Sequence, residues 1–451
     1  MRIRFDRGTL VLEPEAGDGD PREIRGAAWD AEVHAWRVPA DRYRELAVRF
    51  ADEGVRVTDE IRTIDLAAGF VVPPLRWYQE AALAKWRASG CRGVVVLPTG
   101  AGKTIVALAA MAKLGVGTLI VVPTRVLLDQ WARTLALYWP QPIGRLGDGA
   151  RQVEAITVAT YASAVAWAPR LGDRFGLVVV DEAHHVGAWC PSEVLEMMVA
   201  PARLGLTATP PESAALERHI GPVVYSLGVA DLVGDGLAAF DIVTVPIELG
   251  REERARYREL RGKFAARYAA FQRATGGASW HEFARESGRT AAGREVLAAW
   301  RASRALIAYP SGKRDALRAL LAHHAGTRTL VFTGDNATAY TIARELLVMP
   351  VTCEIGRAER ARMLDRFRAG DASVLVSSQV LDEGLDVPDA ELAIVVGGTS
   401  SARRHVQRIG RVLRPREGKR ARVYELAVEH TKEVDYVERR RAGLAQMGGA
   451  A

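Results

Sequence analysis

The sequence contains little cysteine and no long apolar run. Its 3 cysteines, Cys91, Cys190 and Cys353, lie too far apart in the chain to indicate a zinc cluster or a disulfide framework. The longest apolar runs, such as residues 177–180, have the length of strands, whereas a membrane-spanning helix needs about 20 apolar residues. The N-terminus also lacks the apolar core of a signal peptide. We therefore expect a cytoplasmic protein without a membrane partner.

The composition is that of an ordinary folded protein with a basic surplus. Hydrophobic residues make up 49% and charged residues 25% of the 451 residues, which argues against extensive disorder. At about 150 residues per domain, this length indicates about three domains. The formal net charge of +7 and the pI of about 9.4 favour a polyanionic partner such as a nucleic acid.

Hydrophobic patterning divides the chain into segments of different kinds. Residues 1–70 combine short alternating stretches with one amphipathic segment, which predicts a small mixed domain. From about residue 75, short apolar runs alternate with helix-length segments, a pattern typical of a parallel sheet covered by helices on both faces. The predicted strands of a first sheet are 93–97, 118–122, 156–159, 177–180 and 204–207, and those of a second are 329–333, 351–354, 373–378, 392–396 and 422–426.

A segment without strand signals separates the two predicted sheets. Residues 251–310 are rich in arginine and alanine, carry about twice as many basic as acidic residues, and are interrupted by Gly276 and Gly277. We interpret this segment as a helical insertion. A charge-rich helix is most often a solvated face, so its composition alone does not establish a role in binding.

The strongest chemical motif follows the first predicted strand of the first sheet. Gly100 and Gly102 allow backbone N–H groups to surround phosphate oxygens, and Ala101 lies between them. Lys103 can reach the β- and γ-phosphates, and the Thr104 hydroxyl can bind Mg²⁺. The strand and the predicted helix that flank this loop are the setting that a P-loop requires. The first motif position is leucine instead of glycine, which leaves the phosphate-contacting half intact.

A pair of acidic residues supplies the second half of an ATPase site. The apolar run 177–180 is followed by Asp181 and Glu182. At the carboxyl end of a strand, Asp181 can hold Mg²⁺ and Glu182 can orient and deprotonate the attacking water. His184 and His185 follow, but no carboxylate or cysteine stands at ligand spacing, so we do not expect a zinc site. His184 is expected to couple the γ-phosphate site to neighbouring segments.

The order of these motifs resembles that of superfamily 2 helicases. By this resemblance, Gln79 contacts adenine, whereas Thr124, Arg125 and Thr160 contact the nucleic-acid backbone. The matching segments of the first lobe are residues 77–79, 122–125, 160–161, the DEAH box 181–184 and the segment 206–210, which in the family couples hydrolysis to movement.

Two segments of the second lobe extend the resemblance. Residues 377–386 resemble the fifth helicase motif, in which Ser377 would contact nucleic acid, and residues 407–414 resemble the sixth. On a helix, positions 407, 411 and 414 share one face. Gln407, Arg411 and Arg414 could therefore act on a single ligand, and the planar guanidinium suits the charge of a transferring phosphoryl group.

Within this superfamily the chain resembles the XPB family. Residues 220–225, 230–236 and 412–415 carry XPB-like features, and the insertion takes the place of the thumb. The resemblance implies an ATP- and Mg²⁺-dependent DNA helicase of 3′–5′ polarity, active in nucleotide excision repair or transcription. It also implies a monomer or a heterodimer with a nuclease of the Bax1 kind. An Arg-Glu-Asp triplet that XPB relatives carry after the Thr-Ala-Thr motif is absent here, which leaves strand separation less well supported than translocation.

The sequence therefore predicts an α/β protein with two tandem RecA-like lobes. The expected domains are a DNA-recognition-like domain at 1–70, the ATP-binding lobe at 71–235, and a second lobe at 236–451 with the insertion at about 251–310. Two alternatives remain open at this point: an RNA helicase of the DEAH kind, and the motor subunit of a restriction or defence complex.

Overall fold

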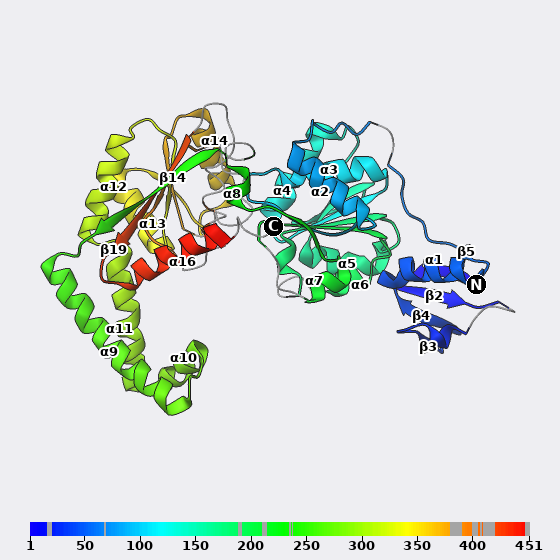
Figure 1. Cartoon of the computed structure of the whole chain (residues 1–451), viewed down its shortest axis with the longest axis horizontal. Helices are drawn as coiled ribbons and strands as arrows, with labels where there is room; N and C mark the ends of the chain where they lie inside the picture. The colour runs from blue at the N-terminus through cyan, green and yellow to red at the C-terminus, as the bar shows by residue number, and fades with distance from the viewer. Residues whose placement is uncertain are drawn as a thin grey trace. The chain divides into compact units, whose positions relative to one another are not determined.

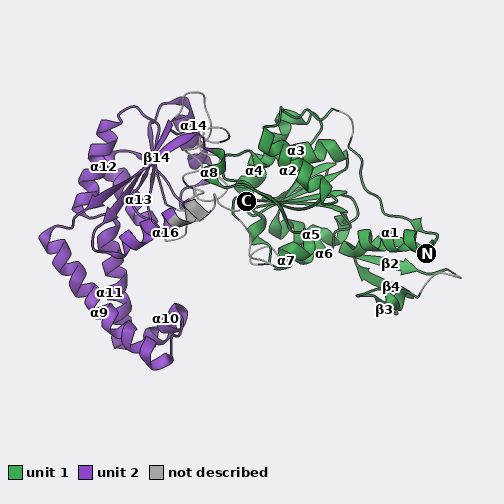
Figure 2. Ribbon diagram, viewed as in Figure 1, with its two compact units in different colours: residues 1–232, 384–386, 446–451 green, residues 233–383, 387–445 purple. Residues whose placement is uncertain are grey.

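The structure of the chain is a computed structural model that describes residues 1–15, 20–66, 69–187, 192–209, 214–233, 236, 238–378, 390–398, 405, 408 and 420–446. It has two compact units, unit 1 with residues 1–232 and unit 2 beginning at residue 233 (Figure 2). No helix among the described residues is both long and apolar enough to cross a membrane.

Unit 1 begins with a small domain built on a five-stranded sheet. The strands follow the order β3-β4-β2-β1-β5, and their pairings are antiparallel except for β1 with β5. Helix α1 packs its apolar side, Leu46 and Phe50, against buried strand residues such as Leu10 and Val38, and Val199 from the following domain joins this core. The elements are β1 (Arg2–Asp6), β2 (Thr9–Glu13), β3 (Ala28–Asp30), β4 (Ala35–Pro39), α1 (Tyr43–Asp52) and β5 (Thr58–Asp59).

The first lobe follows within unit 1 and is built on an eight-stranded sheet of order β13-β6-β12-β11-β7-β10-β8-β9 (Figure 1). All pairings are parallel except the β8–β9 hairpin. The strands are β6 (Arg92–Val96), β7 (Thr118–Val122), β8 (Gly144–Gly147), β9 (Ala150–Gln152), β10 (Ile156–Thr160), β11 (Leu177–Asp181), β12 (Ala202–Thr207) and β13 (Val223–Ser226). The helices are α2 (Trp77–Ala88), α3 (Lys103–Leu114), α4 (Arg125–Tyr138), α5 (Tyr161–Leu171), α6 (Glu193–Glu196), α7 (Ala214–His219) and α8 (Val229–Leu232).

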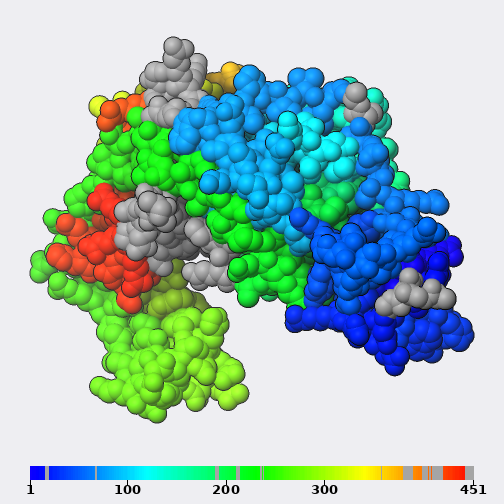
Figure 3. Space-filling view, turned by 45° about the vertical axis from the view of Figure 1, so that its right-hand side comes forward, coloured from blue at the N-terminus to red at the C-terminus, as the bar shows by residue number. Residues whose placement is uncertain are grey.

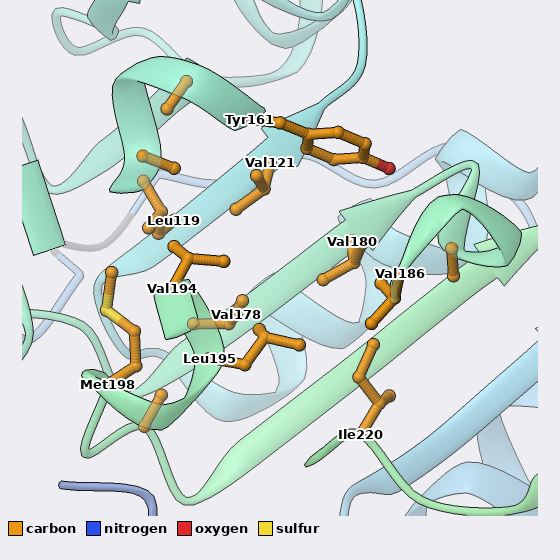
Figure 4. Packing of buried hydrophobic residues seen from close by; sticks show 14 of the residues in the cluster. Leu119, Val121, Tyr161, Val178, Val180, Val186, Val194, Leu195, Met198 and Ile220 are labelled. Carbon is orange, nitrogen blue, oxygen red and sulfur yellow. The ribbon is translucent and has the colours of Figure 1, made fainter. Parts of the chain in front are cut away.

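Aliphatic side chains from the central strands hold the lobe together. Val178 and Val180 of β11 lie between Val121 of β7 and the side chains of Leu195 and Ile220 (Figure 4). Every residue of β7 and β11 is buried, which explains the continuous apolar runs in the sequence.

Unit 2 contains a second parallel sheet, of order β14-β19-β18-β15-β17-β16. Its strands are β14 (Ala239–Ile247), β15 (Thr329–Phe332), β16 (Met349–Val351), β17 (Val374–Ser377), β18 (Leu392–Val395) and β19 (Arg420–Val428), and its helices are α12 (Ser311–His323), α13 (Asn336–Leu346), α14 (Arg357–Ala369) and α16 (Lys432–Gln446). The prediction of two parallel-sheet lobes is thus confirmed. The strand expected at 351–354 instead ends at Val351, and Thr352 and Cys353 lie in the segment leading to α14. Edge strand β14 was not predicted.

The helical insertion is also confirmed, as α9 (Arg251–Thr275), α10 (Trp280–Gly288) and α11 (Ala291–Ala308). Gly276 ends α9 in the left-handed conformation, with φ of +65°, which glycine adopts without strain. The far ends of the three helices enclose a core of their own, in which Phe264, Phe283 and Leu297 are buried among further aromatic side chains. The insertion therefore stands out from the rest of unit 2 as a packed body (Figure 3).

Candidate ATP site and helicase motifs

The P-loop connects β6 to α3 with the geometry that its glycines permit. Gly100 has φ of +92° and Gly102, the residue before α3, has φ of +78°. Both values lie in the left-handed region, where a side chain would be strained. The ammonium group of Lys103 donates hydrogen bonds to the carbonyl oxygens of Leu97 (3.1 Å) and Pro98 (3.4 Å). Lys103 therefore folds back over the loop at the N-terminus of α3, while Ala101 is buried beneath it.

Gln79 and its neighbour Tyr78 hold the P-loop from below. The Gln79 amide donates from Nε2 to the carbonyl oxygen of Ala101 (3.0 Å), and its Oε1 accepts from the Arg76 backbone N–H (2.9 Å). The Tyr78 hydroxyl donates to the same Ala101 oxygen (3.0 Å). A Cβ on Gly102 would lie 2.5 Å from Gln79 Nε2, so a side chain at position 102 would displace this amide. The amide expected to contact adenine thus lies buried against the P-loop in this structure.

The acidic pair lies at the carboxyl end of β11, on the same sheet edge as the P-loop. Asp181 is buried, its Oδ2 accepts from the indole N–H of Trp131 (2.8 Å), and its Oδ1 accepts from the Glu182 backbone N–H (2.9 Å). Burial raises the pKa of Asp181, whereas the bond from Trp131 and the charge of Lys103 act in the opposite direction. A buried carboxylate close enough to the P-loop lysine to feel its charge fits a divalent cation, whose charge offsets the cost of desolvation.

Glu182 occupies a backbone conformation that is uncommon for a residue with a side chain, with φ of +49°. Its carbonyl oxygen, like that of Asp181, accepts a hydrogen bond from the Tyr161 hydroxyl, at 3.2 Å and 2.6 Å respectively. Tyr161 opens α5 and reaches across the sheet edge to these two residues. Sequence reasoning had assigned no role to Tyr161 or Trp131 in the acidic site, because the contacts join elements 20 and 50 residues apart.

His184 links the acidic pair to the end of β12. Its Nδ1 lies 2.9 Å from the Thr207 hydroxyl oxygen and 3.5 Å from Glu182 Oε2. The Thr207 hydroxyl also donates to the carbonyl oxygen of Thr209 (3.0 Å). A continuous polar chain therefore runs from Glu182 to the segment expected to couple hydrolysis with movement. Pro210, the last residue of that segment, lies outside the described residues.

The predicted nucleic-acid contacts of the first lobe lie at helix N-termini on this same edge. Thr124 caps α4 by accepting from the Leu127 N–H, and Thr160 caps α5 by accepting from the Ser163 N–H. Arg125 is exposed and pairs with Asp148 (3.0 Å). Parallel strands place the starts of α3, α4 and α5 together, where their N–H groups favour phosphate oxygens.

The predicted site residues of the second lobe are either buried or lie outside the described residues. Ser377 is fully buried, and its hydroxyl donates to the carbonyl oxygen of Val351 (2.9 Å), so this side chain is committed to the core and does not reach a ligand here. Gln407, Arg411 and Arg414 lie outside the described residues. Two residues of their segment are described and buried, His405 and Arg408, and Arg408 donates to the carbonyl oxygens of Thr333, Ser378 and Gly397.

A P-loop and an acidic pair on one parallel-sheet edge, followed by a second parallel-sheet lobe, define an ATPase motor core of the helicase kind. The fold agrees with that of the Hef helicase domain from Pyrococcus furiosus, with a TM-score of 0.53 and 23% sequence identity over 81% of this chain and 98% of that chain. This likeness concerns the fold.

Three family sequence models match the chain. They describe the res subunit of type III restriction enzymes over residues 73–212, the helicase conserved C-terminal domain over 312–416, and the damage recognition domain of the xeroderma pigmentosum group B helicase over 3–61.

Relatives that match along most of the chain carry the names XPB and Rad25. The chain is 35% identical to the DNA 3′-5′ translocase XPB2 of Sulfurisphaera tokodaii, over 97% of this chain and 99% of that protein. It is 31% identical to the putative DNA 3′-5′ helicase Rad25 of Haloarcula marismortui, over 98% and 68% respectively. The DNA 3′-5′ helicase XPB of Kineococcus radiotolerans is 31% identical, over 87% and 66%.

The chain belongs to the XPB family of superfamily 2 helicases. The resemblance read from the sequence motifs is thereby confirmed. One matching model takes its name from restriction enzymes, yet the relative that matches over 97% of this chain and 99% of its own length is a DNA translocase named XPB2. These relatives support the DNA-helicase reading and neither alternative.

Proposed function

We propose that this chain is an ATP-dependent DNA translocase and helicase of 3′–5′ polarity, acting in DNA repair or transcription. The observation that carries the proposal is the convergence of Lys103, Asp181 and Glu182 on one sheet edge of an XPB-family chain. Lys103 opens α3 after β6, and the two acids lie at the end of β11. Only β12 separates β6 from β11 in the sheet, which brings the proposed phosphate-binding and water-activating groups to neighbouring positions on one edge.

ATP and Mg²⁺ are the cofactors that this site fits. Gly100, Ala101 and Gly102 would surround the phosphates, and Thr104 and Asp181 would hold Mg²⁺. A bound Mg²⁺ supplies charge stabilisation to the transferring phosphoryl group. Trp131 fixes the carboxylate of Asp181 in place, and Glu182, aligned by its left-handed backbone, accepts the proton of the attacking water.

The second lobe completes the proposed active site. Arg411 and Arg414 are proposed as the cations that stabilise the γ-phosphate in the transition state, with Gln407 on the same helix face. The proposal is supported by helix geometry, in which positions 407, 411 and 414 share one face. His405 and Arg408, the described residues of this segment, are buried.

DNA would be held mostly through its phosphates, at Thr124, Arg125 and Thr160 of the first lobe. Contacts to the backbone carry little sequence information, so we expect weak sequence preference. A nuclease of the Bax1 kind is proposed as a partner. Relatives of this chain include subunits of the general transcription and DNA repair factor IIH in Arabidopsis thaliana and Antonospora locustae.

The test is the ATPase rate of wild type and Glu182→Gln without nucleic acid, with single-stranded DNA, with forked DNA and with RNA. DNA should stimulate wild type, and Glu182→Gln should bind ATP but lose turnover by at least about 100-fold. Glu193→Gln, an exposed acid on α6, is the matched control and should keep full activity. Stimulation by RNA in preference to DNA would contradict the proposal.

Translocation and strand separation are distinguished by two further assays on the same protein. Displacement of a triplex-forming strand reports movement along duplex DNA, and release of a labelled strand from a fork reports opening. Because the Arg-Glu-Asp triplet is absent, we expect strong triplex displacement and weaker fork opening.

A further inference from the structure

Five arginines line one cavity where the N-terminal domain meets the first lobe, both within unit 1. The cavity has a volume of about 620 Å³, and its polar lining consists of the side chains of Arg25, Asp41, Arg42, Arg44, Glu45, Arg92 and Arg218. Five guanidinium groups thus face two carboxylates. The ATP site uses none of these residues.

Both carboxylates of the cavity are already engaged. Asp41 Oδ2 lies 3.3 Å from Nδ1 of His219, a buried residue whose Nε2 lies 3.4 Å from Glu196 Oε1. Glu45 pairs with Arg42. Among the described residues, Arg25 and Arg218 have no ion-pair or hydrogen-bond partner, so a positive surplus remains at the cavity.

Two of the cavity's guanidinium groups are held in place by backbone carbonyls. Arg44 donates from Nη1 to the carbonyl oxygen of Gly90 (2.6 Å), and Arg92 donates from Nη2 to that of His219 (2.8 Å). Burial, and then the neighbouring charge of Arg44, lower the pKa of Arg92. Like charges fixed side by side are destabilised until an anion neutralises them, and a guanidinium offers two parallel N–H donors to phosphate oxygens.

We infer that this arginine cavity binds phosphate groups of the DNA backbone, as a contact separate from the helicase motifs. The shared chemistry is a phosphate oxyanion, and its assignment to DNA rests on the proposed function. The cavity is open and lined by arginines of two domains, from Arg25 in the N-terminal domain to Arg218 on α7. A duplex held there would therefore bridge the N-terminal domain and the lobe that contains the P-loop.

The experiment is the binding of labelled duplex and forked DNA to the full chain, followed by fluorescence anisotropy over a range of salt concentrations. The variant is the double substitution Arg25→Glu and Arg218→Glu, which leaves the fixed Arg44 and Arg92 intact. Losing two phosphate contacts should reduce the steepness of log affinity against log salt by about 0.9 per contact. Turnover of ATP at saturating DNA should not change.

Two control variants separate a defined site from general electrostatics. Arg25→Lys with Arg218→Lys keeps the charge and should restore most of the salt slope. Arg87→Glu, an exposed residue on α2 outside the cavity, changes the charge of unit 1 in the same direction and should leave the slope nearly unaltered. An equal loss with Arg87→Glu would overturn the inference.

A second arm distinguishes DNA from small phosphates. Inorganic phosphate and pyrophosphate are titrated against wild type and the double glutamate variant by calorimetry. If these ions bind wild type only, while DNA affinity and salt slope are equal in both proteins, the cavity is a small-anion site and the inference is overturned. If DNA does not stimulate the ATPase of wild type, the proposed function is contradicted. The binding measurement would still show whether the arginine cavity contacts DNA.

Discussion

The indole N–H of Trp131 donates a hydrogen bond to Oδ2 of Asp181, with 2.8 Å between nitrogen and oxygen. Trp131 is buried on α4, the helix that begins with a predicted nucleic-acid contact, and Asp181 ends β11. A residue on the helix that begins next to a proposed DNA contact thereby orients the carboxylate proposed to hold Mg²⁺.

Trp131→Phe should weaken Mg²⁺ binding while preserving the packing of α4. Loss of a hydrogen bond to a metal-binding group typically lowers metal affinity or activity by about 10–100-fold. The Mg²⁺ concentration for half-maximal ATPase activity should therefore rise by about tenfold or more. Trp139→Phe is the matched control, since the buried Trp139 Nε1 has no hydrogen-bond partner among the described residues. An equal shift in both variants would refute the positioning role.

Thr207→Val should separate ATP hydrolysis from movement. Valine has nearly the shape of threonine but lacks the hydroxyl that meets His184 Nδ1 and the Thr209 carbonyl oxygen. We expect ATP turnover within about tenfold of wild type and a larger loss of triplex displacement, since Thr207 contacts His184 and Thr209 while Glu182 itself stays in place. Thr329→Val in β15, whose buried hydroxyl only meets the Thr327 carbonyl oxygen, should leave both activities intact. Proportional losses of both activities in Thr207→Val would count against coupling.

Arg411→Ala should lower ATP turnover by about 10³-fold or more with little change in nucleotide binding. The reason is that a guanidinium aimed at the γ-phosphate stabilises charge that develops only in the transition state. The exposed Arg439 on α16 provides the control substitution, Arg439→Ala. Normal hydrolysis by Arg411→Ala would mean that the second lobe does not supply this cation.

Removing the far end of the helical insertion should weaken binding to forked DNA and spare basal ATPase activity. Residues 251–310 contain 13 Arg and Lys against 6 Asp and Glu, a surplus equal to the net +7 of the whole chain. Tyr257 and Ile307 belong to the core of the second lobe, whereas Phe264 and Leu297 belong to the insertion's own core. A short Gly/Ser linker in place of residues 262–302 should therefore fold, and forked-DNA affinity should fall by about tenfold or more. Circular dichroism should show the loss of helix content expected for the deleted residues and no further loss. Unchanged affinity for forked DNA in such a folded variant would mean that the insertion is only a solvated helical bundle.

His405 should make the second lobe sensitive to mild acid. Burial, and then the charges of Arg440, Arg408 and Arg441, lower the pKa of His405 to about 3. The pKa of histidine in an unfolded chain is about 6.5. Below that pH, His405 is therefore protonated in the unfolded state but still neutral in the folded state, which favours unfolding. The contribution to stability is complete above about pH 6.5 and is lost progressively as the pH falls towards 3.

The measurement for His405 is the unfolding temperature at pH 7.5 and 5.5. The unfolding temperature of wild type should fall more from pH 7.5 to pH 5.5 than that of His405→Gln. The imidazole proton resonances of His405 should not shift across this pH range. A normal titration of His405 near pH 6.5 would contradict the burial seen here.

Much of this architecture could be predicted because it depends on local pattern. Continuous apolar runs predicted β7 and β11, the helix-length segments between the predicted strands correspond to helices such as α3 and α4, and a glycine pair marked the end of α9. Strand β14 escaped prediction because its residues are mostly half-buried and it contains Pro246, which an edge strand tolerates.

The site was predictable where motif chemistry is local, as at Lys103 and Glu182. Trp131 and Tyr161 could not be found, since their partners are brought near only by the sheet order. Ser377 lies at the end of β17, as its motif position predicts, but the sequence does not show that its hydroxyl is buried and donates to the Val351 carbonyl oxygen.

The pairing of β14 with β19 sets the order in which the second lobe can be assembled during synthesis. β14 joins its sheet only through β19, and residues 248–419 are translated between the two. At about 5–20 residues per second, the ribosome leaves the first strand of this lobe without a partner for on the order of ten seconds or longer. The first lobe waits for a shorter stretch, because β6 pairs with β12, which begins at Ala202, and all strands of this lobe have been translated by Ser226. A nascent chain should therefore reach a protease-resistant first lobe well before the second. A stop codon between β18 and β19 would leave β14 and β18 as open edges available to other chains.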